Sequence, residues 1–117
     1  MKKTSYKTGL FAEGLCRLRL RLAFYRILEM RYKTPVGEID ILASKGNTVI
    51  AIEVKARQTM GEALEAISPA QRRRIARALE YYIAHNPKFS NASLRFDAMA
   101  VMPKRWPRHI KNAWQVV

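Results

Sequence analysis

Hydrophobic residues near the start of the chain recur at the spacing of an α-helix. From residue 10 to about residue 22, the apolar positions that share one face are Phe11, Leu15, Leu18 and Leu22. A second face carries charge, because Glu13, Arg17 and Arg21 follow one another at intervals of four residues. A helix of a compact protein turns its apolar face inward, so the pattern predicts an amphipathic helix with its leucine-rich face buried.

The middle of the chain alternates apolar and polar residues, as β-strands do. Residues 25–30 are predicted to form a short strand, and residues 32–35 a basic connection. Two stronger strands, 37–43 and 48–55, are separated by Ser44-Lys45-Gly46-Asn47, which has the composition of a hairpin turn.

A second helix is predicted to begin at Ser68-Pro69-Ala70-Gln71. Serine is a preferred N-cap, proline fits the first helical position, and glutamine stands where a capping box requires it. The helix is expected to continue to about His85, where Asn86-Pro87 ends it, and residues 94–102 are predicted to form another strand. Beyond Pro103 the pattern does not decide between helix, strand and coil.

The predicted order of helix, three strands, helix and strand is typical of an α/β sandwich, in which helices flank a mixed sheet. The chain has 117 residues and contains no repeat and no linker-like segment. That length is enough for one hydrophobic core but too short for two. We therefore expect a single domain over residues 1–117.

The charge of the chain narrows the classes of molecule that it is expected to bind. Lys and Arg number 22 against 9 Asp and Glu, which gives a formal charge of +13 and favours polyanions, nucleic acid first and anionic membrane surfaces second. No apolar run approaches the roughly 18 to 20 residues of a spanning helix, and the polar start is unlike a signal peptide. A lone Cys16 excludes an internal disulfide and a thiol metal site. We expect a cytoplasmic protein.

Ionisable residues collect on one face of the two middle strands. On residues 37–43, alternation places Glu38, Asp40 and Leu42 on one face and Ile39, Ile41 and Ala43 on the other. On residues 48–55, it places Ala51, Glu53 and Lys55 on one face and Ile50, Ile52 and Val54 on the other. If the turn makes Ala43 the partner of Thr48, Asp40 faces Ala51 and lies diagonal to Glu53. Diagonal neighbours are about 7 to 8 Å apart at the backbone, which two carboxylates can bridge around one cation.

This arrangement has the groups that phosphodiester hydrolysis requires. Unpaired carboxylates repel each other, whereas a Mg²⁺ ion between Asp40 and Glu53 favours both charges. Magnesium retains several waters that can supply the nucleophile. Lys55 lies on the same face as Glu53 and is placed to orient the attacking water or to stabilise charge on a phosphate.

These residues also resemble the motif of a known protein superfamily. Gly37-Glu38-Ile39-Asp40 followed by Glu53-Val54-Lys55 resembles the signature of the PD-(D/E)XK nuclease superfamily. The chain is most similar to the YraN family of bacterial proteins, which resembles archaeal Holliday junction resolvases. The similarity covers nearly the whole chain, and its further motifs are Gly9-Leu10-Phe11-Ala12-Glu13, Gln71-Arg72-Arg73 and Arg95-Phe96-Asp97.

The resemblance implies a restriction-endonuclease-like fold and a Mg²⁺- or Mn²⁺-dependent endonuclease of branched DNA, as in DNA repair or recombination. It implies that Asp40 and Glu53 bind the metal, that Lys55 serves catalysis, and that Glu13 and Gln71 lie at the site. Because the similar resolvases act as dimers, a homodimer is a further expectation. The family usually has glycine where Ala12 and Phe24 stand here.

Other interpretations of these residues stay open. Glu13 can pair with Arg17 on the helix surface, and Glu53 with Lys55 on a solvated strand. Glu38 is either a third ligand or a solvated strand end, and Asp97 either caps or pairs with an arginine. Trp106 can stack on a base, although a tryptophan between prolines more often packs. His85 and His109 stand alone, and we expect no metal role for either.

Basic residues provide a surface that can hold phosphates without reading bases. The candidates for contact with nucleic acid are Arg17, Arg21, Arg72, Arg73, Arg77, Lys104, Arg105 and Arg108. Several of the arginines between 72 and 77 are expected to be ordinary solvated charge, because they lie on more than one helix face. The alternative to an enzyme is therefore a non-catalytic module with the same fold that binds DNA. A weaker alternative is a basic adaptor for RNA or protein.

Overall fold

The computed structural model describes residues 6–115, and the side chains of residues 9–115. Within that range the elements follow the predicted order and add two helical segments and a final strand. They are α1 (Tyr6–Leu22), β1 (Arg26–Thr34), β2 (Gly37–Lys45), β3 (Thr48–Ala56), α2 (Met60–Glu65), α3 (Pro69–His85), the short 3₁₀ helix η1 (Pro87–Phe89), β4 (Ser93–Val101) and β5 (Arg108–Trp114).

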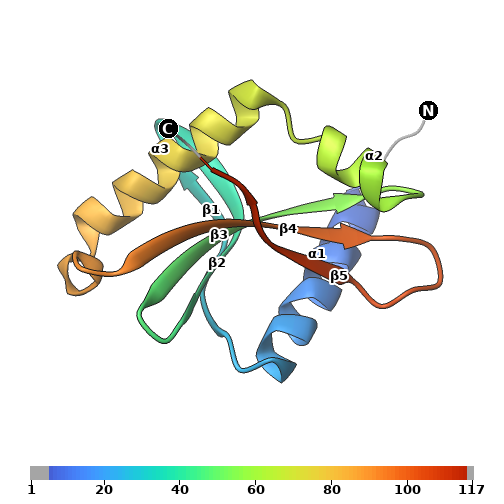
Figure 1. Ribbon diagram of the computed structural model, residues 1–117, viewed down its shortest axis with the longest axis horizontal. Helices are drawn as coiled ribbons and strands as arrows, with labels where there is room; N and C mark the ends of the chain where they lie inside the picture. The colour runs from blue at the N-terminus through green and yellow to red at the C-terminus, as the bar shows by residue number, and fades with distance from the viewer. Residues whose placement is uncertain (1–5, 116–117) are drawn as a thin grey trace.

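The strands of residues 6–115 form one five-stranded mixed sheet in the order β1-β2-β3-β4-β5. Neighbouring strands are antiparallel except β3 and β4, which are parallel and are connected through α2 and α3. In Figure 1, α3 crosses one face of the sheet and α1 the other. The prediction of an α/β sandwich with a mixed central sheet is confirmed, and the architecture is consistent with a restriction-endonuclease-like fold.

Hydrophobic core fills both sides of this sheet. One cluster joins the sheet to α3 through Ile75 and Leu79, and the other joins it to α1 through Cys16 and Leu20. All four of these side chains are at most 1% exposed. The central strand β3 contributes to both clusters, which is why its apolar run is almost continuous.

The predicted start and end of α3 are confirmed. The Ser68 hydroxyl accepts a hydrogen bond from the Gln71 backbone N–H at 3.1 Å, and Pro69 occupies the first turn. Asn86 is the C-cap residue, and Pro87 begins η1. The capping box itself is incomplete, because the Gln71 side chain is hydrogen-bonded to a carboxylate of β3.

The predicted buried face of α1 is wrong. Ala12, Cys16 and Leu20 face the sheet and are at most 3% exposed, while Phe11 is 68% and Leu22 64% exposed. Leu18 is also exposed, and Leu15 is half-buried. The physical reason is that Ala12, Cys16 and Leu20 recur every fourth residue on one helix face, and the packing of this face against the sheet leaves Phe11, Leu18 and Leu22 outside.

Several strand boundaries also differ from the prediction. Strand β1 continues to Thr34, because residues 32–34 pair with β2 instead of forming a connection. The β2–β3 turn contains only Gly46 and Asn47, since Lys45 pairs with Thr48. The left-handed φ of +59° at Gly46 suits such a tight turn. The chain end that the pattern left undecided forms β5 along β4.

A short helix, α2, lies between β3 and α3 and was not predicted. Its N-cap is Thr59, whose hydroxyl accepts a hydrogen bond from the Glu62 backbone N–H at 3.1 Å. The spacing of Thr59 and Glu62 is that of a capping box, so a local signal was present. Among the described residues, no helix combines the length and the apolar character that crossing a membrane requires.

Candidate active site

The register of β2 and β3 brings Asp40 and Glu53 together. Their ladder runs from the pair Lys45–Thr48 to the pair Ile41–Ile52, and Asp40 and Glu53 are the next residues on each strand. The predicted register was therefore wrong by two residues. Because side chains alternate with a period of two, a shift of two residues leaves Glu53 on the predicted face of the sheet. It moves Glu53 from a position diagonal to Asp40 to the position directly opposite Asp40.

The two strands stop pairing regularly at Asp40. Its Oδ2 accepts a hydrogen bond from the Val54 backbone N–H at 2.9 Å, so a side chain takes this donor of β3. The alternation of side chains between the two faces of β2 ends at the same residue. Ile39 packs in the hydrophobic cluster that contains Leu42, whereas Ile41 packs in the cluster on the other side of the sheet. The prediction that Ile39 shares a face with Ile41 is thus wrong here.

Glu53 is one of the two buried charged residues of the described chain, and it is 5% exposed. The Gln71 side-chain amide donates a short hydrogen bond to its Oε2, and the Lys55 ammonium nitrogen lies 3.9 Å from the same oxygen. Burial, followed by the charge of Asp40, raises the pKa of Glu53 to about 8. The protein alone therefore compensates two adjacent negative charges only in part.

Asp40 experiences the same conflict. Burial raises its pKa, and the Val54 N–H and the Lys55 ammonium offset only part of that effect, while the nearby Glu13 carboxylate raises the pKa further. A group that resists ionisation beside a second buried carboxylate is in the position that a bound cation relieves. The electrostatics of Asp40 and Glu53 thus fit a cation between them.

Helix α1 contributes Glu13 to the same cleft. Its side chain is 12% exposed and accepts a hydrogen bond from Arg31 Nε at 2.8 Å. Arg31 is on β1, so the contact links α1 to the sheet edge. The surface pair with Arg17 that the spacing allowed is not among the salt bridges of the described residues, since Glu13 pairs with Arg31 instead.

Close packing of α3 on β2 positions Gln71. A Cβ atom added at Gly37 would overlap the backbone carbonyl of Arg74, so only glycine lets the first turns of α3 come this near to β2. Gln71 lies one turn before Arg74 and reaches Glu53 from there. Gly37 thus has a structural reason to precede the acidic residues of β2.

The resulting cleft has a volume of about 690 Å³ and a predominantly polar lining. All five predicted catalytic residues line it, namely Glu13, Asp40, Glu53, Lys55 and Gln71. Glu38 and Arg74 also contribute to the wall. Arg74 was not among the predicted contacts, although its position three residues after Gln71 on a helix was a usable signal.

The donor set fits a hard divalent cation. Asp40 and Glu53 supply carboxylate oxygens, which are the ligands that Mg²⁺ prefers, and Mg²⁺ commonly uses one or two carboxylates and retains waters. Within the part of the chain that the structure describes, no group of three or more His, Cys, Asp or Glu residues could hold a metal ion. The fit is therefore to a two-carboxylate Mg²⁺ site and not to a closed structural metal site.

The predicted DNA-contacting residues lie on several surfaces. Arg17 and Arg21 are exposed on α1, and Arg73 and Arg77 on α3, which covers the opposite face of the sheet. Arg72 has a packing role, since its Nε donates to the Ile67 carbonyl at 3.0 Å and its guanidinium lies 5.5 Å from the centre of the Trp114 ring. Lys104, Arg105 and Arg108 are exposed at the turn between β4 and β5.

A second polar cluster lies away from the cleft and ties three strands together. Asp97 of β4 is fully buried and accepts hydrogen bonds from Arg95 at 2.7 Å and from His109 of β5 at 2.7 Å. Arg95 also donates to the Tyr25 hydroxyl next to β1. The expectation that Asp97 pairs with an arginine is confirmed, whereas His109 does not stand alone.

Comparison with known proteins agrees with these motifs. Residues 12–101 match the uncharacterised protein family UPF0102. A "UPF0102 protein" from Chelativorans sp. is 45% identical over 113 residues, which cover 97% of this chain and 91% of the relative. One from Methylocella silvestris is 48% identical over 105 residues, covering 90% and 85%. The chain therefore belongs to the UPF0102 (YraN) family, whose motifs its residues resemble.

Proposed function

We propose that this protein is a Mg²⁺-dependent endonuclease that hydrolyses phosphodiester bonds in branched or otherwise structured DNA. The observation that carries the proposal is the pair of adjacent carboxylates, half-buried Asp40 and buried Glu53, beside the Lys55 ammonium group in an open cleft. A structural role alone does not account for two carboxylates whose pKa values are both raised.

Each side chain has a role in this chemistry. Asp40 and Glu53 would hold the cation, which when bound supplies Lewis acidity and an activated water. The Val54 N–H and the Gln71 amide fix the orientation of the two carboxylates. Lys55 stabilises negative charge that develops on the phosphate oxygens during hydrolysis. Arg74 on the cleft wall adds a cation for the adjacent phosphate.

The substrate follows from charge and from family similarity. The formal charge of +13 favours a nucleic acid. Basic residues at the cleft wall, on α1 and at the β4–β5 turn can hold phosphates without reading bases. The preference for branched DNA comes from the resemblance to Holliday junction resolvases alone, so the substrate has to be found by experiment.

The test is cleavage of labelled four-way junction, flap, duplex and single-stranded DNA with Mg²⁺ or Mn²⁺. Wild type is compared with Asp40→Ala and Lys55→Ala, and with Lys88→Ala as a matched control because Lys88 is exposed on η1. We expect cleavage by wild type and by the control, and a loss of at least about 100-fold in both site variants, the usual effect of losing one key catalytic group. Cleavage that survives Asp40→Ala would contradict the proposal.

The second candidate is a non-catalytic module that binds DNA with the same fold. It is favoured by one observation, that no group of three or more His, Cys, Asp or Glu residues in the described part of the chain could hold a metal ion. Under this alternative the wild-type protein binds all four substrates in a salt-dependent manner and cuts none, and Asp40→Ala leaves the affinity nearly unchanged.

A further inference from the structure

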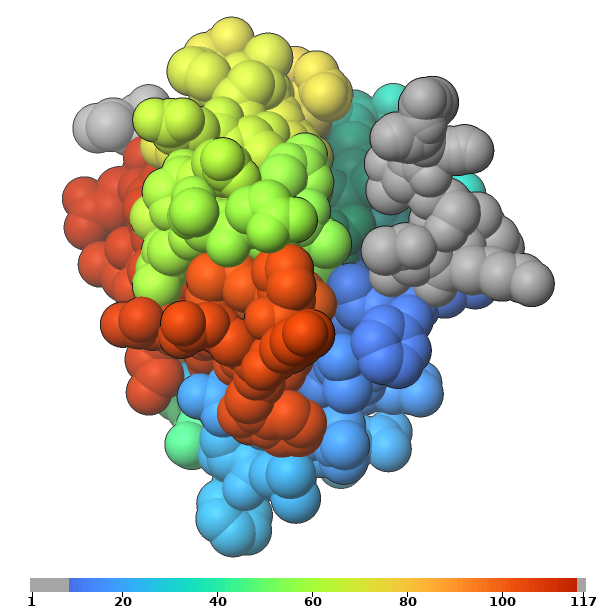
Figure 2. Space-filling model, turned by 90° about the vertical axis from the view of Figure 1, so that its right-hand side faces the viewer, coloured from blue at the N-terminus to red at the C-terminus, as the bar shows by residue number. Residues whose placement is uncertain are grey.

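A second hollow, apolar and rimmed by cations, lies just beyond the C-terminal end of β3, next to the candidate active site. Its volume is about 560 Å³, and it is bounded by α1 and by the segment 102–106 that joins β4 to β5. Figure 2 shows this surface, with the segment in orange-red beside the blue first turns of α1. Nothing in the proposed hydrolysis uses these residues.

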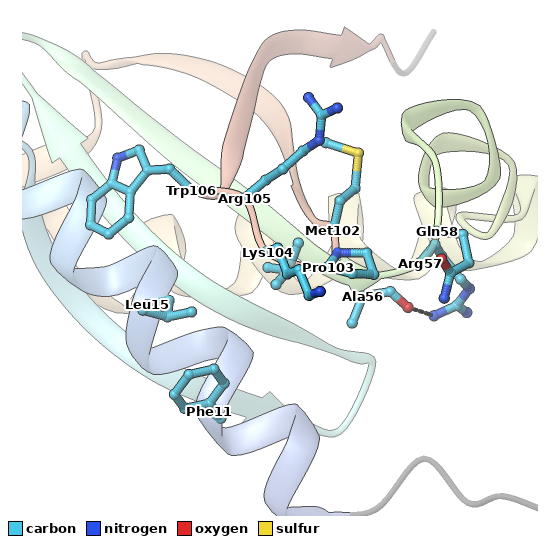
Figure 3. Close-up of a pocket in the computed structure, with 11 residues that line it drawn as sticks. Phe11, Leu15, Ala56, Arg57, Gln58, Met102, Pro103, Lys104, Arg105 and Trp106 are labelled. Atoms are coloured by element: carbon cyan, nitrogen blue, oxygen red, sulfur yellow. Dashed lines mark hydrogen bonds between the residues drawn. The ribbon is translucent and has the colours of Figure 1, made fainter.

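Two exposed aromatic side chains border the hollow. Phe11 of α1 is 68% exposed, and Trp106 is 46% exposed despite the neighbouring prolines that favoured a packed tryptophan. In Figure 3, Phe11 and Leu15 face the segment 102–106, while Trp106 and Arg57 lie at opposite ends of the hollow. Large aromatic faces left in water around a concavity are typical of a binding surface.

The segment that carries Trp106 is held in place by its own backbone. The Arg105 N–H donates to the Met102 carbonyl at 3.3 Å, and Lys104 adopts a left-handed φ of +59°. Pro107, directly after Trp106, is buried. The indole is thus presented from a fixed turn, which lowers the entropy lost when a ligand packs against it.

The charged residues of the lining are Arg57, Lys104 and Arg105, and no acidic residue accompanies them. Within residues 9–115, none of these three side chains forms a salt bridge. An occupant that pairs an apolar planar group with negative charge complements such a lining. An unpaired nucleotide has both features, since its base stacks on aromatic rings while its phosphates meet cations.

The hollow is continuous with the candidate active site. A smaller depression of about 250 Å³ shares Ala56 and Arg57 with the hollow, and it shares Glu13, Val54 and Lys55 with the cleft. A strand of nucleic acid whose phosphate lies at Lys55 can therefore follow the end of β3 to Arg57 and Trp106. A nucleotide ligand accounts for this continuity, whereas an unrelated peptide does not require it.

We infer that this hollow binds an unpaired nucleotide of the strand that lies in the cleft, through stacking on Trp106 and Phe11 and phosphate contacts with Arg57, Lys104 and Arg105. The inference rests on the proposed function for the identity of the cleft. It makes the preferred substrate a DNA that is single-stranded on one side of the scissile bond, such as a flap or a tailed duplex.

The experiment measures DNA binding without metal, so that cleavage is not required. Fluorescence anisotropy in EDTA gives the Kd for a duplex with a single-stranded oligothymidylate tail and for the same duplex with blunt ends. The variants are Trp106→Ala and Phe11→Ala, with Trp106→Phe as the conservative change. Phe24→Ala is the matched control, because Phe24 is 87% exposed but lies outside the hollow.

We expect Trp106→Ala and Phe11→Ala to weaken binding of the tailed duplex about tenfold each, the effect of losing one stacking contact. Binding of the blunt duplex should change by less than about twofold on the same scale. Trp106→Phe should retain most of the affinity, and Phe24→Ala all of it. Because the substituted side chains are exposed, melting temperatures should stay at the wild-type value.

Equal losses on both duplexes, or no loss on the tailed one, would overturn the inference. So would Trp106-dependent binding of an acidic, phenylalanine-containing peptide without binding of oligothymidylate, which would identify a protein ligand. The two proposals fail separately. Tail-specific binding without cleavage on any substrate would sustain the nucleotide site and reject the endonuclease. Metal-dependent cleavage by a protein whose Kd for the tailed duplex is unchanged by Trp106→Ala and Phe11→Ala would do the reverse.

Discussion

Phe24 connects α1 to β1 in a conformation that glycine adopts without cost. Its φ is 69°, and its side chain is 87% exposed. A left-handed conformation costs a residue with a Cβ atom about 1–2 kcal/mol. Glycine, which the resemblance led us to expect at this position, would adopt the same conformation without that cost.

We therefore predict that Phe24→Gly stabilises the protein. The relief of backbone strain exceeds the entropy that glycine loses on folding, so the free energy of unfolding should rise by about 0.5–1 kcal/mol. Chemical denaturation followed by circular dichroism measures the change, with Phe24→Ala as the comparison because alanine retains the Cβ atom. A lower stability of the glycine variant would show that the exposed ring makes a contact that outweighs the strain.

Asp97 is the fully buried carboxylate that joins β4 to β5. Burial alone would raise its pKa, but hydrogen bonds from His109, Arg95 and the Asn112 backbone together hold that pKa below the usual value. A carboxyl group with a lowered pKa in the folded state stabilises the protein above its unfolded-state pKa of about 3.9, and this contribution disappears as the pH falls through the folded pKa.

Asp97→Asn should therefore destabilise the protein by about 3 kcal/mol at neutral pH, because it leaves the Arg95 charge without its partner. The difference from wild type should shrink as the pH falls from about 4, the unfolded-state pKa, toward the lower pKa of folded Asp97, at which the wild-type carboxyl group also becomes neutral. Denaturant titrations across this pH range test the prediction. The control is Glu65→Gln, an exposed position on α2. A difference that is independent of pH would show that packing and not charge is lost.

The set of residues that line the candidate site could be predicted from residue identity, but the contacts that they make could not. Asp40, Glu53, Lys55, Gln71 and Glu13 were all expected at one site, and the cleft contains all of them. Their roles in metal binding and catalysis stay predictions. The partner of Glu13 was not predictable, because Arg31 is on another element and only the packing of α1 against β1 brings the two together.

At the scale of elements, the short distance between Gly37 and α3 determines the geometry of the candidate active site. The backbone of Arg74 occupies the space where a side chain at residue 37 would begin. Any Cβ atom there must displace α3, which also carries Gln71 away from Glu53. The stability of this helix–strand contact and the order of the cleft are therefore coupled.

Gly37→Ala should lower the free energy of unfolding by about 1–3 kcal/mol, the cost of overpacking a close contact. Gly61→Ala provides the matched control, because Gly61 lies in helix α2 and nothing lies within 4 Å of the added methyl group. Alanine there should stabilise the helix slightly. Thermal unfolding of both variants measures the contrast, and an unchanged melting temperature for Gly37→Ala would contradict the packing argument.

Two of the errors in predicting elements have clear physical causes. The amphipathic pattern of α1 identified a helix but the wrong buried face, because the small residues Ala12 and Cys16 are buried while larger hydrophobic residues are exposed. The β2–β3 register was misplaced because a four-residue turn had been assumed, whereas Gly46 supports a turn of two residues. Strand β5 could not be predicted since its short pairing with β4 depends on tertiary contacts.

At the scale of the whole molecule, exposed basic residues of the described chain lie on both faces of the sheet and at the β4–β5 turn. The exposed arginines of α1 and those of α3 are on helices that cover opposite faces of the sheet (Figure 1). A substrate with more than one arm is compatible with this distribution. The positive charge near the cleft is therefore more relevant to substrate binding than the net charge of the whole chain.

The central claim is that Asp40, Glu53 and Lys55 form a metal-dependent site that cuts DNA. The most direct measurement is the cleavage of flap and four-way junction DNA by wild type and Asp40→Asn, each with Mn²⁺, Mg²⁺ or EDTA, at protein concentrations that give equal DNA binding. The account predicts products only for wild type and only with a divalent metal. Products in EDTA, equal cleavage by Asp40→Asn, or full binding without products in any condition would contradict it.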